Sequence, residues 1–165
     1  MLKHFNREWA ALALAALITW PTAQAAPAQV EPFDAKAWQA IQSSKQPAVL
    51  VFSTTDCAHC PAVFKQLGQQ IRQRQLKAPL VAVVMDVPPG EDDAGLLASP
   101  HHGQANRLMA FAGQPQALRF AVDPAWRGVT PYLVFLAPGQ APVKVVGPPK
   151  PEVVAAWALQ AKARR

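Results

Sequence analysis

The sequence has little cysteine and no long apolar run, and each shortage excludes a class of protein. Only two of its 165 residues are cysteines, which is too few for a disulfide-dense scaffold or a four-cysteine zinc site. No stretch approaches the roughly 20 apolar residues that a membrane-spanning helix needs. The formal net charge is +6, but the lysines and arginines are spread along the chain, with no basic cluster that interleaves aromatic residues. Nucleic acid is therefore not expected as a partner.

What the chain does contain is typical of one folded domain. Hydrophobic residues make up 51% of the sequence, which is too large a share for a wholly disordered chain. The length fits a single domain of ordinary size, and no internal repeat is present. We therefore expect one domain that buries a substantial core.

The N-terminus has the residue order of a secretory signal peptide. Lys3 and Arg7 give a basic start, a 12-residue apolar run covers residues 9–20, and the small residues of Ala23-Gln24-Ala25 follow. This order of basic, apolar and small residues is typical of signal peptides. We expect residues 1–25 to be a signal peptide.

Cleavage is expected after Ala25, with retention of the segment as a membrane anchor as the alternative. Residues 26–32 hold two prolines and are predicted to be a linker, followed by a domain over residues 33–165. The signal is of bacterial type, so the predicted location is the periplasm. Because that compartment is oxidising, a cysteine pair can persist there as a disulfide.

Apolar periodicity predicts that helices and strands alternate along the first half of the domain. Residues 48–52 and 80–85 are continuous apolar runs of strand length, which is typical of strands buried on both faces. Helices are predicted over residues 33–44 and over residues 60–77, where apolar side chains recur at spacings of 3 and 4. Residues 88–100 form an acidic stretch that is predicted to be flexible.

The second half is predicted to contain further helices and strands. They are a short helix over residues 104–111, strands over residues 117–122, 132–136 and 143–146, and a final helix over residues 152–163. The turn signal Pro138-Gly139 makes the last two strands a hairpin. Strands that alternate with helices and end in an antiparallel pair predict an α/β sandwich, with a mixed central sheet of four to five strands flanked by helices.

The two cysteines lie in the segment Cys57-Ala58-His59-Cys60, between a predicted strand and a predicted helix. A thiolate, not a thiol, attacks disulfides, and a helix N-terminus stabilises a thiolate through its free N–H groups and its dipole. Two intervening residues in a helical turn bring the sulfurs within bonding reach. Cys57, nearer the loop, is the candidate nucleophile, and Cys60 is the candidate thiol that resolves a mixed disulfide.

These residues resemble a known family. The segment over residues 49–67, the pair Thr130-Pro131 about 70 residues later, and the hairpin and helix that follow are similar to the thioredoxin-like fold, over residues 33–163. The resemblance implies a thiol–disulfide oxidoreductase with a redox-active Cys57–Cys60 disulfide and no metal or organic cofactor. It also implies that Thr130-Pro131 is a substrate-binding element with a cis peptide bond, an ordinary trans proline being the alternative.

Two residues beside the cysteines are candidates for setting the thiol pKa and the reduction potential. His59 is similar to the His that oxidising and isomerising members of the family carry before the second cysteine; it is expected to stabilise the thiolate, and a solvated His without effect is the alternative. Asp56 would oppose thiolate formation by like charge, or would cap the helix instead. Val51 and Val63 stand where reductases of the family carry acids. This pattern favours an oxidising potential and leaves the direction of electron flow open.

Three further positions have two interpretations each. Trp126 precedes Thr130-Pro131 in the chain, so it lines the rim of the active site and binds substrate in one interpretation and is a core aromatic in the other. The adjacent His101 and His102 are candidate ligands for copper or zinc beside the cysteines, although the expectation is that no metal is bound.

The predicted partners are exported proteins that carry thiols or disulfides, and a membrane redox partner is an open addition. A monomer is expected, because no dimerisation domain is evident. Two other functions remain open. One is a thioredoxin-like module that handles copper or assists assembly without general redox turnover, and the other is a dedicated reductase for cytochrome c maturation.

Overall fold

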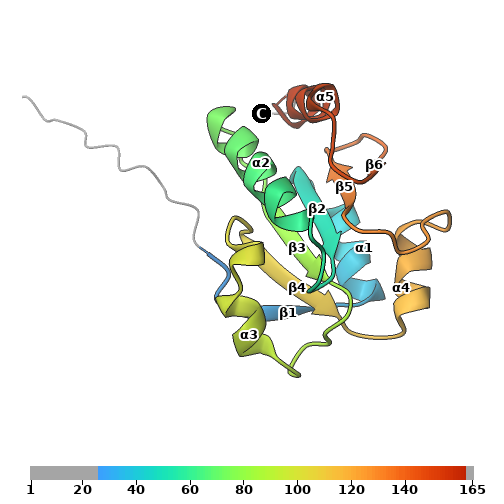
Figure 1. The fold of residues 1–165 in the computed structure, drawn as a ribbon. Coiled ribbons are helices and arrows are strands. Elements are labelled where there is room, and N and C mark those ends of the chain that lie inside the picture. The colour runs from blue at the N-terminus through green and yellow to red at the C-terminus, as the bar shows by residue number, and fades with distance from the viewer. Residues whose placement is uncertain (1–25, 163–165) are drawn as a thin grey trace, which may run out of the picture.

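One six-stranded sheet organises the chain (Figure 1). The structure is a computed structural model that describes residues 26–162, and the predicted signal peptide lies outside them. The strand order is β1-β4-β3-β2-β5-β6. The strands are β1 (Val30–Phe33), β2 (Ala48–Ser53), β3 (Leu80–Val84), β4 (Arg107–Phe111), β5 (Tyr132–Leu136) and β6 (Val143–Val146). The predicted α/β fold with a mixed sheet is confirmed, with six strands in place of the four to five predicted.

Parallel and antiparallel pairs divide the sheet into two parts. The pairs β1–β4, β4–β3 and β3–β2 are parallel, whereas β2–β5 and β5–β6 are antiparallel. Parallel neighbours need long crossover connections, and helices supply them here. The helical elements are α1 (Ala35–Ser43), α2 (Cys60–Gln73), α3 (Asp93–Ala98), the short 3₁₀ helix η1 (Pro100–His102), α4 (Pro115–Val122) and α5 (Pro151–Lys162).

Each face of the sheet carries its own hydrophobic cluster. One cluster joins the sheet to α2 and α5, and the other joins it to α1 and α4. Successive side chains of β2 enter opposite clusters, Val51 on the α2 face and Phe52 on the α1 face, as the pleat of a strand requires. Both cysteines belong to the α2 cluster.

Two elements of the second half differ in type from the prediction. The helix predicted over residues 104–111 is wrong, because β4 forms there, and the strand predicted over residues 117–122 is the helix α4. A strand buried on both faces shows no alternation, so a short apolar run fits either period. The signals of α4 are Pro115 at its first position and the spacing of four between Leu118 and Val122.

Two segments predicted to be irregular contain regular structure. The strand β1 takes up the end of the predicted linker, residues 26–32, and tolerates Pro32 because it is an edge strand that pairs only with β4. The helix α3 forms within the stretch predicted to be flexible, where the Asp92 carboxylate accepts a hydrogen bond from the Gly95 N–H at 3.0 Å, a typical N-cap. Between residues 26 and 162, no helix has the length and apolar character needed to cross a membrane.

Candidate active site

The disulfide lies in the connection between β2 and α2. The strand ends at Ser53, the helix begins at Cys60, and Cys57 and Cys60 are joined with their Cα atoms 5.5 Å apart. Backbone hydrogen bonds close the turn: the Cys57 N–H donates to the Thr54 carbonyl at 3.2 Å, and the Cys60 N–H donates to the Cys57 carbonyl at 3.2 Å. Since α2 begins at Cys60, Pro61 falls in the first turn, where its missing N–H removes no helical hydrogen bond.

The two cysteines differ in their access to solvent. Cys57 is 6% exposed and Cys60 is fully buried. An incoming thiol or disulfide therefore meets Cys57 first, and Cys60 can react only from inside the site. This asymmetry is consistent with Cys57 as the nucleophile and Cys60 as the resolving thiol.

An aspartate on the neighbouring strand connection anchors the loop before the disulfide. The Asp86 carboxylate accepts hydrogen bonds from the Thr55 N–H at 2.9 Å and from the Thr55 hydroxyl at 2.6 Å. Because Asp86 follows β3, the loop is fixed to the strand next to β2. The hydrogen bonds to Asp86 thus fix the start of the cysteine turn relative to β3.

The two candidate tuning residues are both exposed. Asp56 precedes the first cysteine, and His59 is the N-cap residue of α2, although its side chain makes no capping hydrogen bond. The alternative in which Asp56 caps the helix is therefore not observed. Neither side chain is buried against the sulfurs, so any effect on the thiolate acts through solvent-screened electrostatics.

Thr130 and Pro131 lie at the same edge of the sheet as the cysteine loop. Their peptide bond is cis, as the resemblance implied. In the antiparallel pair of β2 and β5, Phe52 lies opposite Tyr132, so the residues just before β5 adjoin the residues just after β2. This register brings two segments more than 70 residues apart in sequence to one edge.

Trp126 packs in the hydrophobic cluster on the α1 face of the sheet. Its side chain is buried, its ring stacks on Tyr132 with centroids 4.2 Å apart, and its indole N–H donates to the Val129 carbonyl at 3.0 Å. This burial favours the interpretation of Trp126 as a core aromatic, and its contact with substrate stays a prediction. Its ring and indole contacts anchor the segment that leads to Thr130.

A residue that the sequence offered only as a metal ligand contacts the cysteine turn. His101, on η1, places its ring nitrogen Nε2 3.1 Å from the Cys57 carbonyl oxygen. Its neighbour His102 is buried and packs edge-on against Phe64 of α2, with ring centroids 5.7 Å apart. Desolvation by burial lowers the pKa of the His102 imidazole. The two adjacent histidines thus both lie against the helix that carries the disulfide.

No arrangement of metal ligands accompanies these histidines. Within residues 26–162, no group of three or more His, Cys, Asp or Glu side chains could hold a metal ion. The contact between His101 and Cys57 spans 44 residues of sequence. No local spacing rule could have identified it, because it depends on how η1 packs on α2.

No model of a known protein family matches the sequence, and no curated protein sequence matches it. Solved structures do match. A secreted Mycobacterium tuberculosis disulfide oxidoreductase is 18% identical with a TM-score of 0.50, over 73% of this chain and 84% of that one. A Bacteroides vulgatus protein assigned as a thiol–disulfide oxidoreductase is 12% identical with a TM-score of 0.51, over 86% of this chain and 90% of that one.

A third likeness is to a Neisseria meningitidis protein assigned as a thioredoxin, at 15% identity and a TM-score of 0.50, over 73% of this chain and 77% of that one. At such identities the likeness concerns the fold. It agrees with the mixed sheet and flanking helices of this chain. The chain is a protein of the thioredoxin-like fold.

Proposed function

We propose that the protein is a thiol–disulfide oxidoreductase that exchanges disulfides with protein substrates. The observation that carries the proposal is the Cys57–Cys60 disulfide at the N-terminus of α2, at the sheet edge that also holds Thr130-Pro131. A disulfide across three residues closes too small a loop to contribute much stability. Its placement at a helix N-terminus, one cysteine reachable and one enclosed, is suited to redox exchange instead.

The exchange conserves atoms and electrons in two steps. In the reducing direction, the Cys57 thiolate attacks one sulfur of a substrate disulfide, forms a mixed disulfide, and releases the other substrate sulfur as a thiolate that takes up a proton. The Cys60 thiol then loses its proton and attacks Cys57 Sγ, which releases the second substrate thiol. Two electrons pass to the substrate, and the enzyme ends as the observed disulfide. Oxidation of a substrate dithiol is the same sequence in reverse.

Two exposed valines lie near the Thr130-Pro131 segment. Val129 is 55% exposed just before Thr130, and Val146, which pairs with Tyr132 across β5 and β6, is also exposed. An extended substrate segment can pair with the backbone at Thr130 while its apolar side chains cover these valines. The surface fits an unfolded or extended polypeptide, so we infer protein substrates.

Export to the periplasm is part of the proposal. It rests on the signal-like order of residues 1–25, and one solved structure of similar fold is described as secreted. In an oxidising compartment the observed disulfide is the resting state. No metal or organic cofactor enters the proposed exchange.

We infer that the couple lies toward the oxidising end of the family range, because Val51 and Val63 stand where reductases of the family carry acids and His59 stands beside Cys60. The test is the equilibrium reduction potential of the mature protein in glutathione buffers. A value of about −120 to −180 mV would support an oxidase or isomerase. A value at or below about −250 mV would overturn the oxidising direction and indicate a reductase that depends on an upstream donor.

The exchange activity itself is tested with two substrates and one trapping variant. The wild type should catalyse insulin reduction in the presence of a thiol donor, or the oxidation of a reduced unfolded protein. In the Cys60→Ser variant, Cys57 should accumulate as a mixed disulfide with the substrate. If neither substrate reacts faster than with glutathione alone and no mixed disulfide forms, the proposed function is wrong.

A further inference from the structure

The carbonyl of the candidate nucleophile accepts two hydrogen bonds. One comes from the Cys60 N–H at 3.2 Å and belongs to the turn itself. The other joins it to His101 Nε2 at 3.1 Å, from a segment 44 residues away. A carbonyl oxygen can only accept, so in this contact Nε2 carries the proton and donates. The carbonyl oxygen of Cys57 is thereby bound by two donors, one from the turn and one from η1.

The segment that presents His101 is packed along α2 by its neighbours. His102 is 3% exposed and lies against Phe64, one turn beyond Cys60. Further along the helix, the Arg72 guanidinium donates to the Gln104 side-chain oxygen at 2.8 Å. The packing of His102 against Phe64 therefore holds the adjacent His101 near the cysteine turn, whereas the hydrogen bond between Arg72 and Gln104 lies further along α2.

We propose that His101 is a positioning residue that favours the reduced form of the site, by holding the Cys57 peptide and presenting an N–H dipole to it. Reduction converts a neutral sulfur into a thiolate, only a few bonds from the Cys57 carbonyl oxygen. The partial negative charge of that oxygen opposes the thiolate, and a donated N–H offsets it. Since the oxidised form carries no such charge, the contact stabilises the reduced form more and makes the couple more oxidising.

Other titratable groups near the cysteine turn also affect the stability of the Cys57 thiolate. They are Asp56 and His59 in the cysteine turn, Asp86 after β3, and His102 on η1. Asp56 and Asp86 oppose a thiolate, and Asp86 is already engaged by Thr55. Among the described residues, His101 is the histidine with a hydrogen bond to a cysteine backbone atom.

The inference rests on the proposed function, and its experiment separates the two. The reduction potential of each variant is measured against glutathione, and the rate of alkylation of reduced Cys57 is followed against pH. His101→Ala removes the donor. His101→Gln restores a side-chain N–H donor at nearly the same distance from the backbone, so it can still donate to the Cys57 carbonyl. Gln104→Ala is the matched control, since it loosens the same segment on the same helix away from the cysteines.

We expect His101→Ala to shift the equilibrium constant with glutathione toward the disulfide by about tenfold, or about 30 mV. The alkylation profile of Cys57 should move to higher pH. His101→Gln should recover most of both shifts, and Gln104→Ala should leave both unchanged.

The proposal is overturned if His101→Ala keeps the wild-type potential, if His101→Gln fails to recover it, or if Gln104→Ala produces an equal shift. The last result would mean that general docking of η1 is responsible. All variants are compared for folding by circular dichroism. Failure of the proposed function would appear separately, as a wild type whose cysteines equilibrate with glutathione but do not exchange with protein substrates.

Discussion

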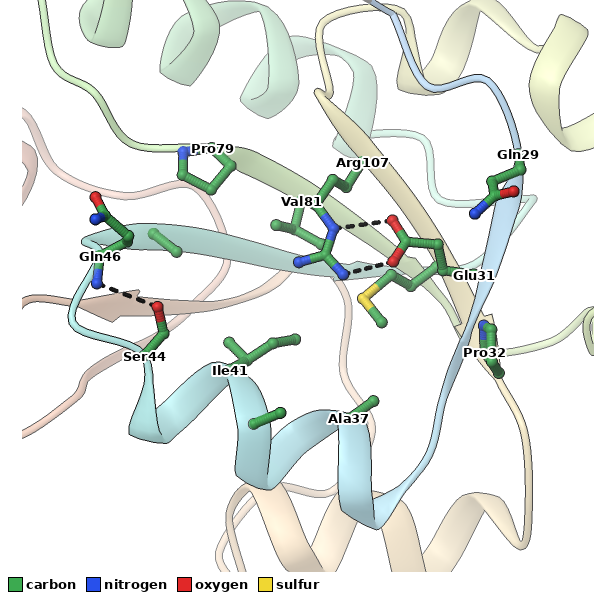
Figure 2. A pocket seen from close by; sticks show the side chains of 13 residues that line it. Gln29, Glu31, Pro32, Ala37, Ile41, Ser44, Gln46, Pro79, Val81 and Arg107 are labelled. Carbon is green, nitrogen blue, oxygen red and sulfur yellow. Dashed lines mark hydrogen bonds and ion pairs between the residues drawn. The ribbon is translucent and has the colours of Figure 1, made fainter.

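The two ends of the sheet differ in how they are built. At the carboxyl end of β2 lies the disulfide, surrounded by the cysteine turn, η1 and the segment before β5. At the opposite end, where β1 to β4 begin, α1 and the strands enclose a pocket of about 430 Å³. Figure 2 shows that the Glu31 and Arg107 side chains meet across its rim in two hydrogen bonds, at 2.8 and 2.6 Å.

The two ends differ in whether they hold a reactive group. In the pocket, the two charged side chains satisfy each other, and Ala37, Ile41 and Val81 supply apolar walls (Figure 2). At the disulfide end, backbone contacts from separate loops hold a bond that can be made and broken.

The largest expected effect separates the two ends by activity. We expect Cys57→Ser to lower protein disulfide exchange by at least about a hundredfold, because serine cannot form the thiolate nucleophile. Arg107→Met, which breaks the ion pair at the pocket, should keep the wild-type rate in the same insulin assay. A loss of exchange in Arg107→Met with the fold intact would mean that the pocket end takes part in the reaction.

The next largest effect concerns the anchor beneath the Thr130 segment. We expect Trp126→Ala to lower the free energy of unfolding by about 3–5 kcal/mol, because it removes a buried ring and the donor to the Val129 carbonyl. The matched control is Phe120→Ala, since Phe120 is 66% exposed, and its effect should stay within about 0.5 kcal/mol. Urea unfolding of the oxidised proteins measures both. If both variants lost the same free energy of unfolding, the buried Trp126 ring would not contribute to stability more than an exposed ring does.

The disulfide end was largely predictable from the sequence because its signals are local. Cys57 and Cys60 follow a buried strand and open a helix, and Thr130-Pro131 precedes another strand. Each of these signals lies within about ten neighbouring residues, so short-range rules can recognise it. The same rules predicted the hairpin and the last helix, and the structure confirms both.

Other features were not predictable because they depend on tertiary contacts. The burial of residues 108–111 on both faces removes the alternation that would identify a strand. The pairing of β1 depends on β4, which is distant in sequence. The contact of His101 with Cys57 and the burial of Trp126 have no sequence period at all, since both follow from how loops fold back on the sheet.

A smaller effect concerns the pH dependence of stability that His102 causes at the disulfide end. Burial lowers the pKa of His102 below its usual value of 6.5, so below that pH the unfolded chain binds a proton more readily than the folded one. Stability should fall as the pH drops from 7 to 5, by at most about 1.4 kcal/mol per pH unit. We expect His102→Leu to flatten this slope in urea unfolding and His59→Gln, at an exposed position, to preserve it. An unchanged slope in His102→Leu would assign the effect elsewhere.

The smallest effect belongs to the pocket end and appears at lower pH. Hydrogen bonds from Arg107 hold the pKa of Glu31 below its usual value of 4.5, so the stabilisation is present above that pH and is lost as the pH falls through the folded pKa. Arg107→Met should cost about 1 kcal/mol or less at pH 7, because 38% of the Arg107 side chain is exposed to screening. The gap to wild type should close as the pH falls below 4.5, whereas Arg127→Met, at an exposed position, should show no such gap. A gap that persists at low pH would mean that Glu31 is not the group that Arg107 stabilises. A change in the disulfide potential would show that the two ends of the sheet are coupled.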